Sequence, residues 1–243
     1  MASNSSSNLV VQHQLTGLET NCYLLYDPGS RDAAIIDVAG PVDELLATVK
    51  REDLNLRFFL FTHGHLDHII GLPTIRDDFP DAMVCMHILE FQNMQTHNDW
   101  VDKWAIKTLG EELIAEWMKD PEFVKTTEFD VSTFNAPDLY LEEGKILELG
   151  KKMIRILHCP GHSPGGLCYS IDNLLFSGDV LFKGSVGRVD VQNSSRDDQI
   201  QSVRRLYKEF DDNTIVYPGH LELTTIGAER VGNQKVSEID IAL

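Results

Sequence analysis

Residues 59–68 have the sequence Phe59-Leu60-Phe61-Thr62-His63-Gly64-His65-Leu66-Asp67-His68. A short apolar run passes here directly into three histidines and an aspartate, which no hydrophobic core requires. The aromatic content and the length of residues 57–61 predict a buried strand, and Gly64 predicts a turn before the apolar, helix-like pair at 69–70. We therefore expect the polar cluster at the carboxyl end of a strand, where α/β sheets place ligands.

The spacing of this cluster is suited to metal binding. His63 and His65 are separated by one residue, so their side chains can point to the same side of an extended loop. Asp67 and His68 follow on the turn into the next helix and can point to a second place nearby. Neutral imidazoles and a carboxylate are ligands for a borderline metal such as zinc, so the sequence predicts a metal site here.

The motif resembles the HxHxDH signature of the metallo-β-lactamase superfamily, in which further ligands come from later parts of the chain. The matching residues occur in the family's order, each after a short apolar segment and at a turn marked by glycine: His162, Asp179 and His220. The resemblance runs from about Leu9 to about Gly232. It implies an α/β fold, a four-layer αββα sandwich, with one helical insertion.

The resemblance also implies the role of each ligand. His63, His65 and His162 would hold one divalent ion, and Asp67, His68 and His220 would hold a second. Asp179 would bridge the two ions, and Asp67 and Asp179 are the candidate catalytic carboxylates. Zinc is favoured, with iron and manganese as alternatives, and a hydroxide between the ions would be a nucleophile at neutral pH. The reaction class implied is hydrolysis, and the protein is expected to be an enzyme.

Asp37 ends a predicted strand shortly before the motif. In the resembled family, an aspartate at this place braces the metal loop by hydrogen bonds, which makes Asp37 a candidate supporting residue behind the ligands. The structural alternative is an aspartate that starts a helix or a turn.

The segment from Ser177 to Asp190, with the sequence SGDVLFKGSVGRVD, resembles the GDTLF...G.GR motif of glyoxalase II, the hydroxyacylglutathione hydrolases, and their shorter bacterial relatives. The residue at the position of Arg188 contacts the glutathione part of the substrate in that family. Residues 218–230 also resemble the shorter relatives, with Leu221 where glycine is more usual. This favours a thioesterase acting on S-lactoylglutathione or a similar small-molecule thioester.

Other activities stay open. Because few residues follow His220, we expect most of the helical C-terminal domain of glyoxalase II proper to be absent. Val189 follows Arg188 where that family has an aromatic residue. The alternatives are a lactonase or other carboxylic-ester hydrolase, a mono-iron persulfide dioxygenase, and a non-catalytic scaffold stabilised by metal. Asp179 disfavours a true β-lactamase, which has cysteine or serine there, and Phe182 disfavours a lactonase, which has tyrosine.

Composition excludes some kinds of partner. The chain has 21 lysine plus arginine residues against 38 aspartate plus glutamate residues, a formal net charge of −17, which argues against nucleic acid or an anionic membrane as a partner. No run approaches the roughly 20 apolar residues of a membrane helix. The scattered cysteines, Cys22, Cys85, Cys159 and Cys168, are expected to be reduced, buried thiols, which favours a cytoplasmic protein.

We expect a disordered N-terminus at residues 1–8 and one domain at 9–243, with a helical insertion at about 90–135. Within the insertion, Trp100 and Trp104 lie four residues apart in a predicted helix over 97–119. The insertion is expected to pack on the domain, to form a contact in a homo-oligomer, or to act as a lid over an apolar pocket. Further helices are predicted at 42–51, 69–78 and 197–210.

Overall fold

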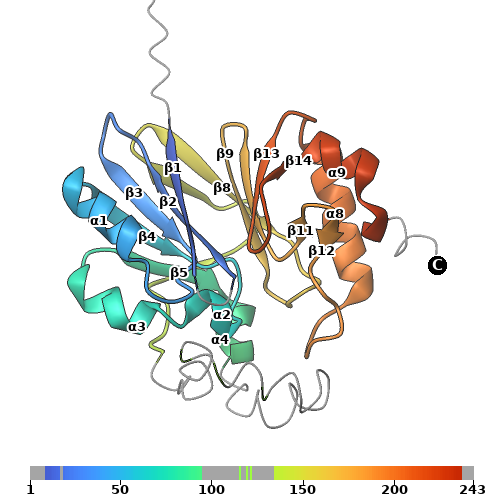
Figure 1. Cartoon of the computed structure of the whole chain (residues 1–243), viewed down its shortest axis with the longest axis horizontal. Helices are drawn as coiled ribbons and strands as arrows, with labels where there is room; N and C mark the ends of the chain where they lie inside the picture. The colour runs from blue at the N-terminus through green and yellow to red at the C-terminus, as the bar shows by residue number, and fades with distance from the viewer. Residues whose placement is uncertain are drawn as a thin grey trace, which may run out of the picture.

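Two sheets face each other in the centre of the molecule, with helices on both outer sides (Figure 1). The computed structural model describes residues 9–16, 19–94, 115, 119, 121 and 134–236. The N-terminal sheet has the strand order β1 (Val10–Leu15), β2 (Asn21–Tyr26), β3 (Asp32–Ile36), β4 (Asn55–Leu60), β5 (Met83–His87), β6 (Leu139–Leu141). The C-terminal sheet has the order β14 (Thr224–Thr225), β13 (Ile215–Pro218), β10 (Leu174–Gly178), β9 (Leu167–Ile171), β8 (Lys152–His158), β7 (Ile146–Leu149).

Helices α1 (Asp43–Arg51) and α3 (Leu72–Ile75) cover the N-terminal sheet, and α8 (Arg196–Glu209) and α9 (Ile226–Gly232) lie on the other side of the molecule (Figure 1). The predicted αββα sandwich is therefore confirmed. The remaining elements are α2 (Leu66–Ile69), the 3₁₀ helix η1 (Arg76–Asp78), α4 (Ile88–Met94) and the small ribbon of β11 (Leu181–Phe182) and β12 (Ser185–Val186). No helix in the described ranges is both long and apolar enough to cross a membrane.

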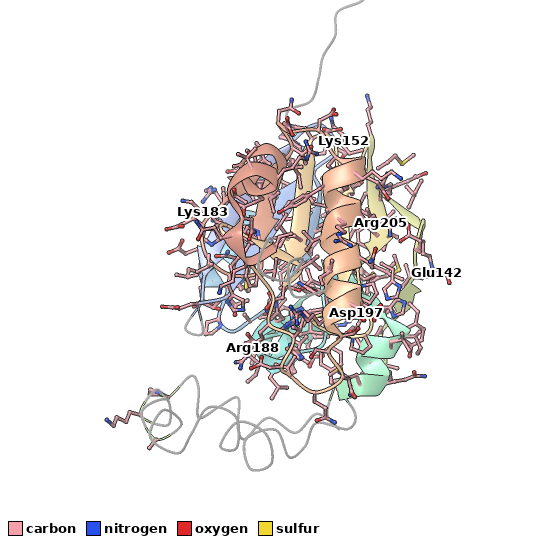
Figure 2. All side chains as sticks on the ribbon, turned by 90° about the vertical axis from the view of Figure 1, so that its right-hand side faces the viewer. Glu142, Lys152, Lys183, Arg188, Asp197 and Arg205 are labelled. Carbon is pink, nitrogen blue, oxygen red and sulfur yellow. The ribbon has the colours of Figure 1, made fainter. Side chains whose placement is uncertain are left out.

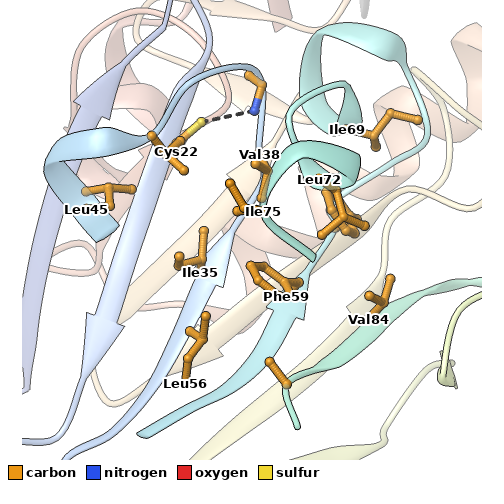
Figure 3. Packing of buried hydrophobic residues seen from close by; sticks show 14 of the residues in the cluster. Cys22, Ile35, Val38, Leu45, Leu56, Phe59, Ile69, Leu72, Ile75 and Val84 are labelled. Carbon is orange, nitrogen blue, oxygen red and sulfur yellow. Dashed lines mark hydrogen bonds between the residues drawn. The ribbon is translucent and has the colours of Figure 1, made fainter. Parts of the chain in front are cut away.

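The four layers follow from strands that are apolar on both faces. Successive side chains of a strand point to opposite faces, so Cys22 and Leu24 of β2 pack under α1, while Tyr23 and Leu25 pack against the C-terminal sheet. Figure 3 shows the hydrophobic cluster between the N-terminal sheet and its covering helices, in which Leu45 of α1 lies over the sheet. Each fully buried side chain of this size stabilises the fold by about 1.5 to 3 kcal/mol.

Strand direction brings several carboxyl ends to one edge. β3, β4 and β5 are parallel neighbours in the first sheet. In the second sheet β10 is parallel to β13, and β8 runs in the same direction because β9 lies antiparallel between β8 and β10. The loops that follow all these strands can therefore meet, which places the site at this edge.

The predicted helix over 69–78 is wrong as a single element. The structure breaks it into α2, α3 and η1, with Gly71 between the first two. A Cβ on Gly71 would lie 2.3 Å from the carbonyl oxygen of Gly40, and the Gly71 amide donates to the carbonyl of Val38 at 2.8 Å. This close backbone approach requires a glycine and interrupts the helix.

The other predicted helices, 42–51 and 197–210, are confirmed as α1 and α8. The predicted helix over 97–119 lies almost entirely outside the described residues, as does the N-terminus. At the end of the insertion, Phe134 is buried and packs edge-on against Phe61 with ring centroids 6.0 Å apart. All four cysteines are free and buried, as expected.

Candidate metal centre

The predicted ligands all converge on the shared edge of the two sheets. His63 and His65 lie in the loop after β4, and Asp67 and His68 lie in α2. The others come from the second sheet, with His162 after β8, Asp179 directly after β10 and His220 after β13. Side chains distant in sequence thus meet because their strands end at one edge.

Their ligand atoms form overlapping groups whose members lie within 4.8 Å of one another: His63, His65 and His162; His63, His68 and Asp179; Asp67, His68 and His220. Asp179 joins the groups. One carboxylate oxygen lies 3.4 Å from Nε2 of His68, and the other lies 3.5 Å from Nε2 of His162 and 3.6 Å from Nε2 of His220. The arrangement has the form of two adjacent cation sites with a shared carboxylate.

Asp37 lies behind the first loop and fixes its geometry. One carboxylate oxygen accepts a hydrogen bond from the Thr62 amide at 2.8 Å, and the other accepts from the Thr62 hydroxyl at 2.8 Å and lies 2.8 Å from Nδ1 of His68. His68 therefore directs Nε2 toward the centre. Nδ1 of His63 lies 3.0 Å from the same hydroxyl, which leaves its Nε2 free to bind a cation.

Backbone carbonyls orient two further imidazoles in the same way. Nδ1 of His162 lies 2.8 Å from the carbonyl oxygen of Arg188, and Nδ1 of His220 lies 2.8 Å from that of Glu19. Each ring then presents Nε2 to the centre. A ligating histidine whose other nitrogen is held by a carboxylate or a carbonyl is typical of metal sites in proteins.

Electrostatics couple these groups strongly. Burial and the neighbouring imidazoles lower the pKa of His63. Burial alone would lower the pKa of His68 and of His220, but the surrounding carboxylates outweigh it and raise both, that of His220 to about 10. Burial would raise the pKa of Asp67, but His68 and His220 outweigh it and hold this pKa well below its usual range.

The donor set fits divalent cations. Nε2 of His63, Nε2 of His68 and Oδ1 of Asp179 are buried and have no hydrogen-bond partner. A buried polar atom without a partner costs about 1 to 3 kcal/mol, and these atoms face the other donors of the cluster. A cation bound between these atoms would remove that cost. Imidazole nitrogens and carboxylate oxygens are ligands for zinc and similar metals, so the residues present fit such an ion.

The structure places Arg188 beside the centre, but its side chain is already paired. Its guanidinium makes two hydrogen bonds to the Asp190 carboxylate, at 2.7 and 2.9 Å. Figure 2 shows Arg188 at the same end of the molecule as Asp197, which lies in the first turn of α8, and far from Lys152. Both partners of the pair are largely exposed, so the guanidinium borders solvent next to the His162 loop.

Sequence reasoning missed two buried side chains that hold the ligand loops. Glu90 of α4 accepts from the amides of Gly64 and Gly165. Gln199 of α8 accepts from the His162 amide at 2.9 Å and donates to the Val180 carbonyl at 2.8 Å. Neither residue belongs to a motif, and their partners are far away in sequence, so no local signal marks them.

A family model described as the metallo-beta-lactamase superfamily matches residues 15–94 and 96–220. The chain belongs to the metallo-β-lactamase superfamily. Members of this superfamily are largely hydrolytic enzymes, and the His and Asp cluster is its metal-binding feature in this chain.

Among curated superfamily members, hydroxyacylglutathione hydrolase GloC of Haemophilus influenzae is 33% identical over 224 residues, covering 90% of this chain and 93% of the relative. Among solved structures, BLEG-1 B3 metallo-beta-lactamase has a TM-score of 0.69 at 31% identity and covers 92% of this chain and 98% of that chain. TTHA1623 in a di-iron-bound form has a TM-score of 0.66 at 27% identity, covering 93% of this chain and 98% of that chain.

Proposed function

We propose that this protein is a metal-dependent thioesterase of the hydroxyacylglutathione hydrolase type. The observation that carries the proposal is the convergent cluster in which Asp179 lies between two groups of imidazoles, with both of its oxygens within 3.6 Å of their nitrogens. The similarity to the hydroxyacylglutathione hydrolase from Haemophilus influenzae supports the thioester as substrate.

His63, His65 and His162 would hold one divalent ion, Asp67, His68 and His220 the other, and Asp179 both, with zinc favoured. Such ions, when bound, polarise the thioester carbonyl and lower the pKa of the attacking water toward about 7. The protein's part is to hold the ligands rigidly, since Asp37 and the carbonyls of Arg188 and Glu19 fix the imidazoles before substrate arrives.

Water adds to the thioester carbonyl carbon, the carbon–sulfur bond breaks, and the products are the hydroxy acid and the free thiol. Asp67 is the more exposed of the two carboxylates at the centre, with 35% side-chain exposure against 9% for Asp179. We assign to Asp67 a hydrogen bond that orients the attacking water and to Asp179 the bridging position, and the proton that the water loses ends on the departing sulfur.

The test is hydrolysis of S-lactoylglutathione by protein whose zinc, iron and manganese content has been measured. Turnover with about two metals per chain is the expected result. A lactone and a β-lactam are assayed in parallel, because the metal chemistry would also suit those carbonyls. Turnover of a lactone or β-lactam without thioester turnover would replace the thioesterase by another hydrolase of this superfamily, and a single iron would favour a dioxygenase.

Arg188 is the proposed contact for an anionic part of the substrate. Arg188→Ala should raise KM for S-lactoylglutathione by about 10-fold and change kcat less, because a charge-assisted hydrogen bond is lost while the Arg188 carbonyl still holds His162. Arg205→Ala is the matched control, since Arg205 is an ion-paired arginine on the outer face of α8 (Figure 2). If Arg188→Ala, Arg205→Ala and the unaltered protein have the same KM, Arg188 does not contact the substrate.

A further inference from the structure

Glu90 is fully buried at 0% exposure, although it is not one of the proposed metal ligands. It lies on α4, and its carboxylate joins two loops. One oxygen accepts from the Gly64 amide at 2.8 Å, and the other accepts from the Gly165 amide at 2.5 Å. Burial of a carboxylate is costly unless hydrogen bonds compensate it, so these contacts hold the side chain and both loops together.

The two glycines allow this close approach. A Cβ on Gly64 would lie 3.2 Å from the Glu90 carbonyl oxygen, and a Cβ on Gly165 would lie 2.9 Å from the Glu90 amide nitrogen. Both distances are shorter than an ordinary van der Waals contact of a Cβ atom. The glycines therefore let the backbone of each loop come within reach of a single carboxylate.

The loops that Glu90 joins carry the three-histidine group. Gly64 lies between His63 and His65, and Gly165 follows shortly after His162. Nδ1 of His65 and Nε2 of His162 are 2.8 Å apart, so a small shift of one loop against the other would separate them. The two loops come from opposite sheets, after β4 and after β8.

The second group depends on other contacts. His68 is held by Asp37 and His220 by the carbonyl of Glu19. In the part of the chain that the structure describes, Glu90 accepts no hydrogen bond from α2, which carries Asp67 and His68, or from the loop of His220. Its influence on geometry is therefore directed at one half of the centre.

We propose that Glu90 is a positioning residue that preassembles the three-histidine half of the metal centre and so sets the affinity of that half for its ion. The proposal rests on the metal binding assumed under the proposed function, but not on the identity of the substrate. If the unaltered protein binds its metals without cleaving thioesters, the proposed thioesterase activity is wrong, but the proposal for Glu90 still stands.

The test is zinc binding to Glu90→Gln, measured by competition with a chromophoric chelator. The carbonyl oxygen of the glutamine side chain can still accept from one loop amide, but its NH2 group only donates, so the other loop amide loses its partner. We expect the affinity of one zinc to fall by about 10- to 100-fold and that of the other to stay within about twofold of the unaltered protein. The proposal would be overturned if Glu90→Gln left both zinc affinities unchanged, or if it lowered both by the same factor.

Glu229→Gln is the matched control. Glu229 is also buried and accepts from a loop amide, that of Gly184 at 2.8 Å, and from the side chain of Asn233 at 2.8 Å. It contacts neither histidine loop through these bonds. If Glu90 has a purely structural role, both variants should lower Tm and neither should change the affinity for zinc. The proposal instead predicts that only Glu90→Gln weakens the binding of one zinc ion.

A measurement on the unaltered protein covers the case in which Glu90→Gln does not fold. Amide hydrogen exchange of Gly64 and Gly165 is followed by NMR on zinc-free protein. Preassembly predicts that both amides are protected at least 100-fold relative to an unfolded peptide before zinc is added. Exchange at the unprotected rate, with protection appearing only after zinc, would overturn the proposal.

Discussion

Asp37 shows how much of this site depends on one side chain behind the ligands. It adopts a left-handed backbone conformation with φ of 56° and accepts hydrogen bonds from both the backbone and the hydroxyl of Thr62 while holding His68. Such a conformation costs free energy for a residue other than glycine. The surrounding hydrogen bonds offset that cost and fix the direction of the His68 ring.

We predict that Asp37→Asn lowers zinc affinity by about 10- to 100-fold, because one oxygen acceptor is lost and His68 loses its anionic partner. Isothermal titration with zinc measures the effect. Asp53→Asn is the control, since Asp53 also has a positive φ, 51°, but lies on the surface in an ion pair with Arg31. An unaltered affinity in Asp37→Asn would show that the bracing contact is dispensable.

His87 provides a prediction about pH. Its ring is stacked on that of His158, with centroids 4.5 Å apart and an interplanar angle of 6°. Burial, followed by repulsion from His158, lowers the pKa of His87 to about 4, against a small opposing effect of Glu142. As pH falls from about 6.5 toward 4, the unfolded chain therefore binds a proton that the folded protein does not, and stability is lost over that window.

Between pH 7 and pH 5 this residue should remove about 1 to 2 kcal/mol from the free energy of unfolding. His87→Gln removes the titration, so its stability should fall less than that of the unaltered protein over the same interval. Urea unfolding of both zinc-free proteins at the two pH values measures the difference. The same loss in both proteins would refute the prediction.

At the scale of elements, α8 positions the second sheet's ligands as well as covering that sheet. Ser195 caps its first turn by accepting from the Asp198 amide, and the Ser195 amide donates to the Gly161 carbonyl next to His162. One turn later, Gln199 holds the His162 amide and the Val180 carbonyl. The helix start is thus tied to the loops after β8 and β10.

We expect Gln199→Leu to lower the free energy of unfolding by about 2 to 4 kcal/mol and to weaken zinc binding, because a buried amide and carbonyl lose their partners. Ser202→Ala is the control. Its hydroxyl donates to the Pro160 carbonyl at 2.7 Å from the same helix, but its partner is not adjacent to a ligand. Chemical denaturation and zinc titration are carried out on both variants. Equal free energies of unfolding and equal zinc affinities in the two variants would contradict the prediction.

The predicted strand at 57–61 corresponds to β4, whereas the predicted helix at 69–78 does not form as one element, for a physical reason. Buried strands such as β2 and β10 are short apolar runs bounded by turns, a pattern contained within each segment. The predicted helix at 69–78 also has local helical periodicity. It breaks because Gly71 must approach the backbone of Gly40, a contact from a different part of the chain that periodicity does not contain.

At the scale of the whole molecule, the metal centre joins the two halves of the sandwich. The three-histidine group takes His63 and His65 from the N-terminal half and His162 from the C-terminal half, and the Asp67, His68 and His220 group is divided in the same way. A cation bound at either group therefore crosslinks the sheets. Binding should stabilise the folded protein as a whole.

We predict that removal of metal by a chelator lowers Tm and that zinc restores it, by about 5 to 10 °C for each ion present at 100 times its Kd. Differential scanning calorimetry measures this shift. Asp179→Ala, which removes the shared carboxylate, should show a smaller zinc-induced shift than the unaltered protein. A Tm that does not respond to chelator or zinc would exclude a centre that links the two halves.

The sequence by itself determined the superfamily, the αββα sandwich and the residues that meet at the centre, because ligand motifs and apolar runs are local patterns. Apart from the support by Asp37, which the resemblance already implied, only the tertiary structure decided how those ligands are held. The contacts of Glu90 and Gln199, and the pairing of Arg188 with Asp190 beside the His162 loop, depend on which segments the fold brings together. A hydrogen bond between distant segments has no periodicity or spacing, so it becomes visible only when the strands have been assembled into sheets.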